Sequence, residues 1–236
     1  MSPAIHNNAH TIRTITFDLD GTLLDTVPDI AVAANAMLRE LGQPAYTAEA
    51  IATFVGHGTA QLVARCLPNM GADALAQALD IFRRHYTIEN GRRSKPYPGV
   101  VQALEMLNGA GLPLAVVTNK PAAFTKPLLA STGIAPFFRF AISGDSLAEK
   151  KPHPLPLRHA CERFGVTPAE NLHIGDSRHD AAAARAAGCP VWLVPYGYNA
   201  GEPVQAVDCD AIVATLTEAA QRVLAAHAAV SPAPTF

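Results

Sequence analysis

Residues 14–22 read TITFDLDGT, an apolar run that ends in two aspartates and a glycine. Side chains alternate along an extended strand, so Asp18 and Asp20 face one side and their apolar neighbours face the other. Two carboxylates in one small space repel each other and favour a cation or a shared proton, and Gly21 allows a sharp turn after them. The stretch therefore predicts either a chemical site at a strand end or an aspartate-rich turn.

The composition is that of a globular chain long enough to bury a substantial core. Of its 236 residues, 49% are hydrophobic and 16% are charged, which is far from the disordered or collagen-like extremes. The 18 basic and 20 acidic residues leave a formal charge of -2. Because nucleic acids and anionic membranes are bound through basic patches, we expect neither as a partner.

Redox and targeting signals favour a cytoplasmic location. The four cysteines are far apart and form no Cys-x-x-Cys pair, which favours reduced thiols. Residues 1–12 lack the apolar stretch of a signal peptide, and no apolar run approaches the ~20 residues that span a membrane. We therefore expect a soluble intracellular protein.

Short apolar runs alternate with segments of helical spacing through most of the chain. This order is typical of an α/β fold with a doubly wound parallel sheet, a Rossmann-like core with helices on both faces. The predicted strands are residues 14–19, 113–118, 171–175, 191–194 and 210–213, and the predicted helices are 99–108, 122–131, 155–164, 178–187 and 217–227.

One segment, residues 27–95, breaks this alternation. Its apolar residues recur every three or four positions, and nothing in it reads as a strand. We predict a small all-helical cap domain at 27–95, inserted after the first strand, and an α/β catalytic core formed by 1–26 and 96–236. Such a module could close over the first strand like a lid; the alternative is that its helices pack into one common core.

Polar residues follow three of the predicted strands, at the edge where parallel sheets bind their ligands. Residues four apart share a helix face, so Asp176 and Asp180 can point the same way. Several carboxylates in one place favour a hard divalent cation, and magnesium suits a site that also holds phosphate. The residues at the three strand ends are Asp18 and Asp20, then Thr118, Asn119 and Lys120, then Asp176 and Ser177.

Two further polar residues are ambiguous when taken alone. Lys151 lies in KKPHP at 150–154, where prolines could aim its ammonium group at the site, but a solvated lysine pair is the alternative. Thr118 could bind a ligand or cap a turn. A hydroxyl, an amide and an ammonium group opposite a nucleophile is the arrangement that phosphoryl transfer requires.

Four motifs in this order resemble the haloacid dehalogenase superfamily of phosphatases, and the resemblance runs from about residue 13 to the end. The helical insert resembles the small cap of the subgroup that acts on small phosphorylated metabolites. The motifs are DLDGT at 18–22, VVTNK at 116–120, KKPHP at 150–154 and GDSRHD at 175–180.

The resemblance implies separate roles for the aspartates. Asp18 is the expected nucleophile that forms an aspartyl phosphate, and Asp20 is the expected general acid and base. An acid at position 20 favours phosphoester hydrolysis over dehalogenation. Mg²⁺ is expected on the Asp18 carboxylate, the Asp20 backbone carbonyl and the Asp176 carboxylate, with Asp180 supporting them.

The resemblance also implies the groups that bind phosphate. Thr118 and the amide of Asn119 are expected to hold phosphoryl oxygens, and Lys151 is expected to offset the negative charge of nucleophile and substrate. The other histidines form no metal-binding motif such as HExxH, so we expect them to be structural or exposed. They include His153, His159, His173 and His179.

The expected partner is a small phosphorylated metabolite. The core is most similar to the subgroup that hydrolyses 2-phosphoglycolate to glycolate and phosphate, and Gly56, His57 and Gly58 resemble its substrate loop in the cap. An ordinary turn is the alternative there, and His57 or Arg65 could meet a substrate carboxylate. A phosphatase for a sugar phosphate, N-acetylmuramic acid phosphate or pyrophosphate, a phosphomutase, and an inactive phosphate-binding module stay open, as does the choice between monomer and homodimer.

Overall fold

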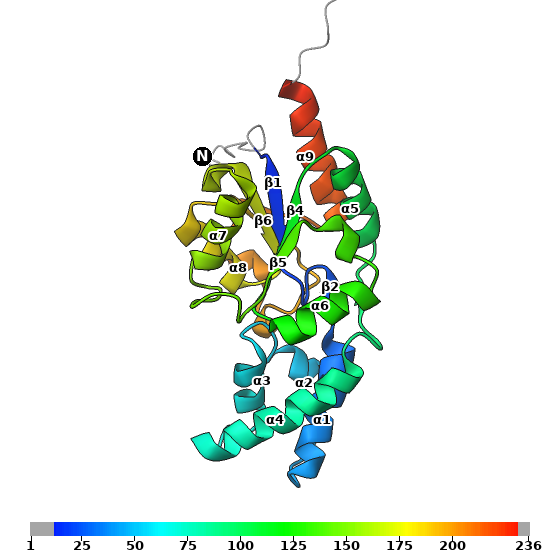
Figure 1. The fold of residues 1–236 in the computed structure, drawn as a ribbon, viewed down its shortest axis with the longest axis vertical. Coiled ribbons are helices and arrows are strands. Elements are labelled where there is room, and N and C mark those ends of the chain that lie inside the picture. Colours follow the sequence, from blue (N-terminus) through cyan, green and yellow to red (C-terminus); the bar gives the residue numbers. More distant parts are fainter. Residues whose placement is uncertain (1–11, 231–236) are drawn as a thin grey trace, which may run out of the picture.

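Six parallel strands form the centre of the protein, and a helical unit lies beyond their carboxyl ends (Figure 1). The structure is a computed structural model that describes residues 12–230. The strand order is β5-β4-β1-β6-β7-β8, so β1 pairs with β4 on one side and β6 on the other. The strands are β1 (Thr14–Phe17), β4 (Leu114–Val117), β5 (Phe140–Ile142), β6 (Asn171–Gly175), β7 (Val191–Leu193) and β8 (Ala211–Ile212).

The two faces of β1 differ in polarity, as alternation along a strand predicts. Ile15 and Phe17 are buried in the apolar cluster on one face. On the other face, the Thr14 hydroxyl donates to Asn171 Oδ1 at 3.0 Å, and the Thr16 hydroxyl lies 3.0 Å from His173 Nδ1. A buried polar stripe therefore runs between β1 and β6 toward their carboxyl ends.

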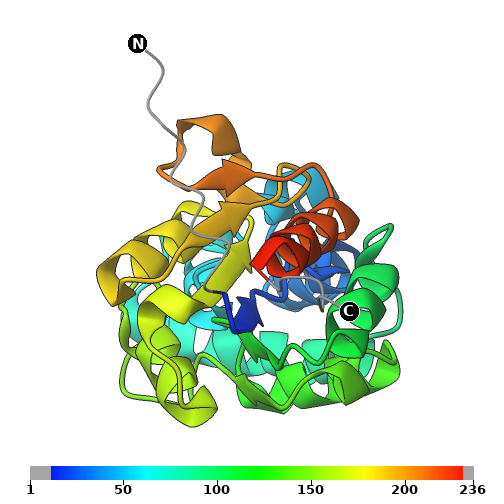
Figure 2. The ribbon, with the colours of Figure 1, turned by 90° about the horizontal axis from the view of Figure 1, so that it is seen from above.

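Helices cover both faces of the sheet (Figure 2). The cluster on one face joins α5 and α9, and the cluster on the other face joins α7 and α8. This arrangement confirms the predicted doubly wound α/β fold. The core helices are α5 (Val100–Gly109), α6 (Ala122–Ser131), α7 (Leu155–Phe164), α8 (Arg178–Ala187) and α9 (Leu216–Val230); short 3-10 turns are η2 (Ala135–Phe137), η3 (Pro168–Glu170), η4 (Asn199–Gly201) and η5 (Val204–Ala206).

The helical unit has an apolar cluster of its own. Met37 of α1 and Phe82 and Tyr86 of α4 lie at its centre. Phe124 of α6 also belongs to this cluster, and its ring centre lies 4.8 Å from that of Tyr86. The core thus contributes the buried Phe124 side chain to this cluster, and the core residue Tyr198 packs against it. The cap helices are α1 (Val27–Glu40), α2 (Ala48–Ala52), α3 (Thr59–Cys66) and α4 (Ala72–Glu89).

Two linkers join cap and core, and they pair as a short antiparallel ladder of β2 (Leu24–Asp25) and β3 (Lys95–Pro96). The Tyr198 hydroxyl accepts from the backbone N–H groups of Thr26 and Val27, at 2.8 and 3.1 Å, and donates to Asp25. This side chain of the core therefore fixes the start of the first cap helix.

The structure departs from the sequence prediction in a few elements. Strand β5 was not predicted, and β3 begins at Lys95, inside the segment in which no strand was expected. The first strand ends at Phe17 rather than at residue 19. The boundaries at 26/27 and 95/96 stay a prediction, and residues 1–11 and 231–236 of the predicted core lie outside the described residues. Within 12–230, every helix is too short or too polar to span a bilayer.

Candidate active site

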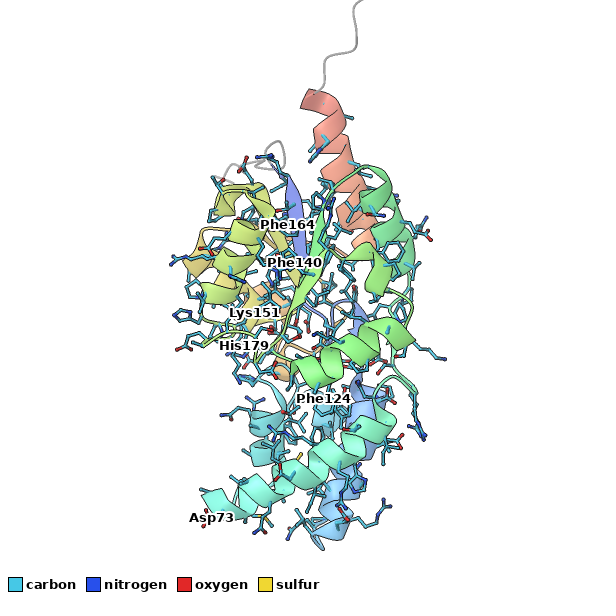
Figure 3. All side chains as sticks on the ribbon, viewed as in Figure 1. Asp73, Phe124, Phe140, Lys151, Phe164 and His179 are labelled. Carbon is cyan, nitrogen blue, oxygen red and sulfur yellow. The ribbon has the colours of Figure 1, made fainter. Side chains whose placement is uncertain are left out.

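The carboxyl ends of β1 and β4 meet the cap at a pocket, and the carboxyl end of β6 lies next to that of β1. Figure 3 shows Lys151 and His179 at this end of the core, with Phe124 between core and cap. The cap side of the pocket is mainly apolar, with Ile30, Val55, Phe82 and Tyr86 in its wall. The core contributes Asp18, Asp20, Thr118, Asn119 and Lys120.

Three buried carboxylates form a tight group beside this pocket. Oxygens of Asp18, Asp176 and Asp180 lie within 4.8 Å of one another. Burial, together with the neighbouring carboxylates, raises the pKa of Asp18 to about 6 and that of Asp176 to about 8. The predicted meeting of the first and third strand ends is therefore present in the structure, and Asp18 and Asp176 hold protons more strongly than free aspartates do.

Lys151 lies between two of these carboxylates. Its Nζ is 3.0 Å from Asp18 Oδ1 and 2.6 Å from Asp180 Oδ1, and the residue is 3% exposed. Burial opposes the charge of Lys151, but the two carboxylates outweigh it and raise its pKa. The alternative of a solvated lysine pair does not describe Lys151, although it fits Lys150, which is exposed and donates to the His57 carbonyl at 2.8 Å.

Asp180 is held by the start of α8. Its Oδ2 accepts from the backbone N–H and the hydroxyl of Ser177, at 3.1 and 2.6 Å, in a capping box. Its Oδ1 contacts Lys151 and lies 3.0 Å from His173 Nε2. Burial opposes ionisation of Asp180, but Lys151 and His173 outweigh it and lower its pKa. This carboxylate is therefore ionised and fixed in position.

His173 was missed as a residue of the site by sequence reasoning. Its ring is fully buried and joins Thr16 to Asp180. The sequence did hold a signal for it. Side chains alternate along a strand, so His173 lies on the same face of β6 as Gly175 at the carboxyl end of the strand. His173 therefore supports the polar side of the site without reaching the pocket lining.

Asp176 sits in a close-fitting backbone cradle. Its two oxygens accept from the Thr22 hydroxyl at 3.0 Å and from the Tyr198 backbone N–H at 2.7 Å. A Cβ placed on Gly21 would come within 2.5 Å of this carboxylate, and one on Gly197 within 2.2 Å of its Cβ. A residue with a Cβ would clash with Asp176 at either position, so both positions require glycine.

The second strand end places Thr118 and Asn119 at the pocket. The Asn119 side-chain amide donates to the Gly56 carbonyl at 2.9 Å and to the Lys151 carbonyl at 2.8 Å. Asn119 thus ties a cap loop and the lysine loop to β4. Thr118 is 4% exposed and its hydroxyl accepts from the Lys120 backbone N–H at 3.2 Å.

Lys120 is a second lysine of the site that sequence reasoning did not assign. Its side chain is 3% exposed, and its Nζ lies 2.8 Å from Asp20 Oδ1. The same Nζ lies 4.8 Å from the centre of the Tyr86 ring. Burial opposes the charge of Lys120, but Asp20 and Tyr86 outweigh it and raise its pKa.

The cap loop brings its glycines to the pocket, but His57 and Arg65 lie outside the pocket lining. Gly56 and Gly58 have φ values of 113° and 86°, which favour glycine. The His57 ring packs against that of His179, with ring centres 3.9 Å apart. Burial, His179 and Arg65 lower the pKa of His57 to about 4.

The donor set fits a hard divalent cation. When all four carboxyl groups and both ammonium groups of the described site are charged, they leave an excess of two negative charges, which a bound cation would offset. Asp18 Oδ1 is buried and faces Lys151 as an ion pair, yet no described group donates an aligned hydrogen bond to it. Oxygen ligands of this kind suit Mg²⁺.

A sequence model of the haloacid dehalogenase-like hydrolases matches residues 15–194, and the chain belongs to this family. A phosphoglycolate phosphatase of Thiobacillus denitrificans is 50% identical, over 89% of this chain and 94% of that protein. Another, of Nitrosospira multiformis, is 48% identical, over 88% and 94%. A crystal structure described as a predicted phosphoglycolate phosphatase of Haemophilus somnus 129PT has a TM-score of 0.86 and 34% identity, over 89% of this chain and 97% of that chain.

Proposed function

We propose that this phosphatase of the haloacid dehalogenase-like family hydrolyses 2-phosphoglycolate to glycolate and phosphate. The observation that carries the proposal is the pair of aspartates at the end of β1, Asp18 and Asp20, which line one pocket and have separate lysine partners. Support for the substrate comes from the relatives, which are phosphoglycolate phosphatases at up to 50% identity.

In this proposal Asp18 attacks phosphorus and displaces the glycolate oxygen. The new bond joins an Asp18 oxygen to phosphorus, and the bond from phosphorus to the ester oxygen breaks. Lys151 next to Asp18 offsets negative charge as the phosphoryl group approaches. A pKa of about 6 leaves most of the Asp18 carboxylate ionised at neutral pH, as a nucleophile requires.

Asp20 provides the proton transfers. It gives a proton to the leaving glycolate oxygen and later takes one from the water that attacks the aspartyl phosphate. That second step releases phosphate and restores the Asp18 carboxylate. The oxygens of the phosphoryl group are assigned to Thr118 and to the backbone amide of Asn119, because the side-chain amide of Asn119 already binds two carbonyls.

The residues proposed to hold Mg²⁺ are Asp18, Asp176 and the backbone carbonyl of Asp20, with Asp180 orienting the group through Lys151. A magnesium ion bound there supplies positive charge beside the phosphoryl group. We also propose a cytoplasmic location and a small phosphorylated metabolite as the partner.

The test measures phosphate release from a panel of esters with and without Mg²⁺. We expect Mg²⁺-dependent hydrolysis with the highest kcat/KM for 2-phosphoglycolate, and Asp18→Asn should abolish it because the amide is not a nucleophile. If no ester in the panel releases phosphate in the presence of Mg²⁺, the enzymatic mechanism is refuted. A higher kcat/KM for a sugar phosphate would refute only the substrate.

A further inference from the structure

The mostly apolar pocket contains one positive charge that the proposed mechanism leaves unused. Among the described residues that line it, Lys120 is the only cationic one. Lys151 offsets the charge of Asp18 and Asp180, whereas Lys120 faces Asp20 and the aromatic wall of the cap. An ammonium group carries three donors, so the Asp20 contact leaves capacity for a second anion.

A polar group of the cap lies beside this lysine without a partner. The Tyr86 hydroxyl is buried and has no hydrogen-bond partner within residues 12–230. An unpaired buried hydroxyl lowers stability, and an acceptor supplied by a ligand would remove that cost. The Tyr86 ring is held by Phe82 and Phe124, with ring centres 5.3 and 4.8 Å away, so its position is fixed before any ligand arrives.

The short length of 2-phosphoglycolate places its carboxylate close to Lys120. In 2-phosphoglycolate one methylene group separates the ester oxygen from the carboxylate. Asp20 has to reach that ester oxygen, and Lys120 Nζ lies only 2.8 Å from Asp20. The carboxylate on the neighbouring carbon therefore falls beside Lys120. Arg65 is not available in the same way, because its guanidinium donates to the Thr53 carbonyl at 3.0 Å and lies outside the pocket lining.

We propose that Lys120 of the core and Tyr86 of the cap together bind the carboxylate of a two-carbon phosphomonoester. This inference rests on the proposed function and names the residues that select its substrate class. The carboxylate accepts from the ammonium group and from the tyrosine hydroxyl, so it joins core and cap across the pocket. Esters without this carboxylate leave the Tyr86 hydroxyl unpaired and gain nothing from Lys120.

The experiment compares 2-phosphoglycolate with ethyl phosphate, a two-carbon ester that has a methyl group in place of the carboxylate. The readout is the ratio of the two kcat/KM values, because a general loss of activity cancels in it. We expect Lys120→Met to lower the ratio by about 10- to 100-fold and Tyr86→Phe by about tenfold, as the loss of charge-assisted hydrogen bonds implies. Tyr86→Phe keeps the ring and removes a hydroxyl without a described partner, so it should fold.

Two matched variants serve as controls. Lys150→Met removes a nearby positive charge outside the pocket lining, and Tyr46→Phe removes a hydroxyl elsewhere in the cap. Both should keep the wild-type ratio. The inference is overturned if either Tyr86→Phe or Lys120→Met keeps that ratio, or if Lys150→Met lowers it as much as Lys120→Met does. A wild type that hydrolyses neither ester refutes the proposed function instead.

Discussion

At the scale of single residues, the two aspartates that follow β1 differ mainly in which lysine each one contacts. Lys151 holds Asp18 within the buried carboxylate group, while Lys120 holds Asp20 at the pocket wall. Asp18 is 7% exposed and Asp20 is less buried. Asp18 is therefore fixed in position, as the proposed nucleophile requires, and Asp20 lies at the pocket wall, where the proposed mechanism needs a proton donor.

The distinct role proposed for Asp20 predicts a kinetic signature in Asp20→Asn. With p-nitrophenyl phosphate, whose leaving group needs no proton, the first step should proceed and the second should stall. We expect a burst of about one equivalent of p-nitrophenol followed by turnover slowed by about 100-fold or more. Rapid-mixing absorbance measurements check this, with Asp18→Asn as the variant that should show no burst. Equal loss of burst and turnover in Asp20→Asn contradicts a role limited to proton transfer.

The site also shows which residues a sequence pattern can reveal. Asp18, Thr118 and Asp176 stand at strand ends, so the alternation of strands and helices was enough to bring them together. Tyr86 lies on a cap helix and reads as part of an apolar stripe. Its neighbour Lys120 is 34 residues away in the chain, and only the folded structure reveals that contact.

At the scale of elements, one buried aspartate joins the two ends of the cap. Asp29 is fully buried at the start of α1 and accepts from the backbone N–H groups of Gly91, Arg93 and Ser94, at 2.9 to 3.0 Å. The Ser94 hydroxyl also donates to it, at 2.6 Å. Asp29 therefore closes the cap where the chain leaves α4.

Removal of this carboxylate should destabilise the protein far more than removal of an exposed one. Asp29→Ala leaves three backbone donors without their acceptor, so we expect a loss of about 3 kcal/mol in the free energy of unfolding. The control is Asp80→Ala, whose exposed carboxylate pairs with the exposed Arg83, with an expected change of about 0.5 kcal/mol or less. Urea denaturation followed by circular dichroism measures both. Equal changes contradict the role given to Asp29.

The elements that sequence reasoning missed are short. Strand β5 has only three residues, and Arg139 separates it from the apolar residues Phe137 and Phe138, so no apolar run of strand length marks it. The β2–β3 ladder has two residues on each side. Such strands are defined by their partners, whereas the longer buried strands and the cap helices carry their own periodicity.

At the scale of the whole molecule, the buried carboxylates link stability to pH and to metal. Their pKa values of about 6 and about 8 lie above the ordinary 3.8. Asp18 and Asp176 therefore hold more protons in the folded, metal-free protein than in the unfolded chain. The stability that these groups contribute is present below pH 3.8 and is lost as pH rises through 6 and 8.

Mg²⁺ that binds to Asp18 and Asp176 should displace the protons that these carboxyl groups hold. We expect the rise in Tm on adding Mg²⁺ to be larger at pH 8 than at pH 6, because more protons compete at the lower pH. Thermal unfolding at both pH values, with and without Mg²⁺, measures this difference. Asp176→Asn removes one proposed ligand and should reduce the rise at both pH values. A rise that is equal at the two pH values contradicts proton competition.

The contacts of Tyr198 determine how strongly the joint between core and cap depends on the sequence of the cap. Its hydroxyl binds the first linker through the backbone N–H groups of Thr26 and Val27, and its own N–H binds Asp176. Every residue type except proline offers such an N–H group. Apart from the Asp25 side chain, which accepts from the same hydroxyl, the joint therefore places little demand on the sequence of the linker. A different insert that enters in the same direction would therefore leave the cradle of Asp176 unchanged.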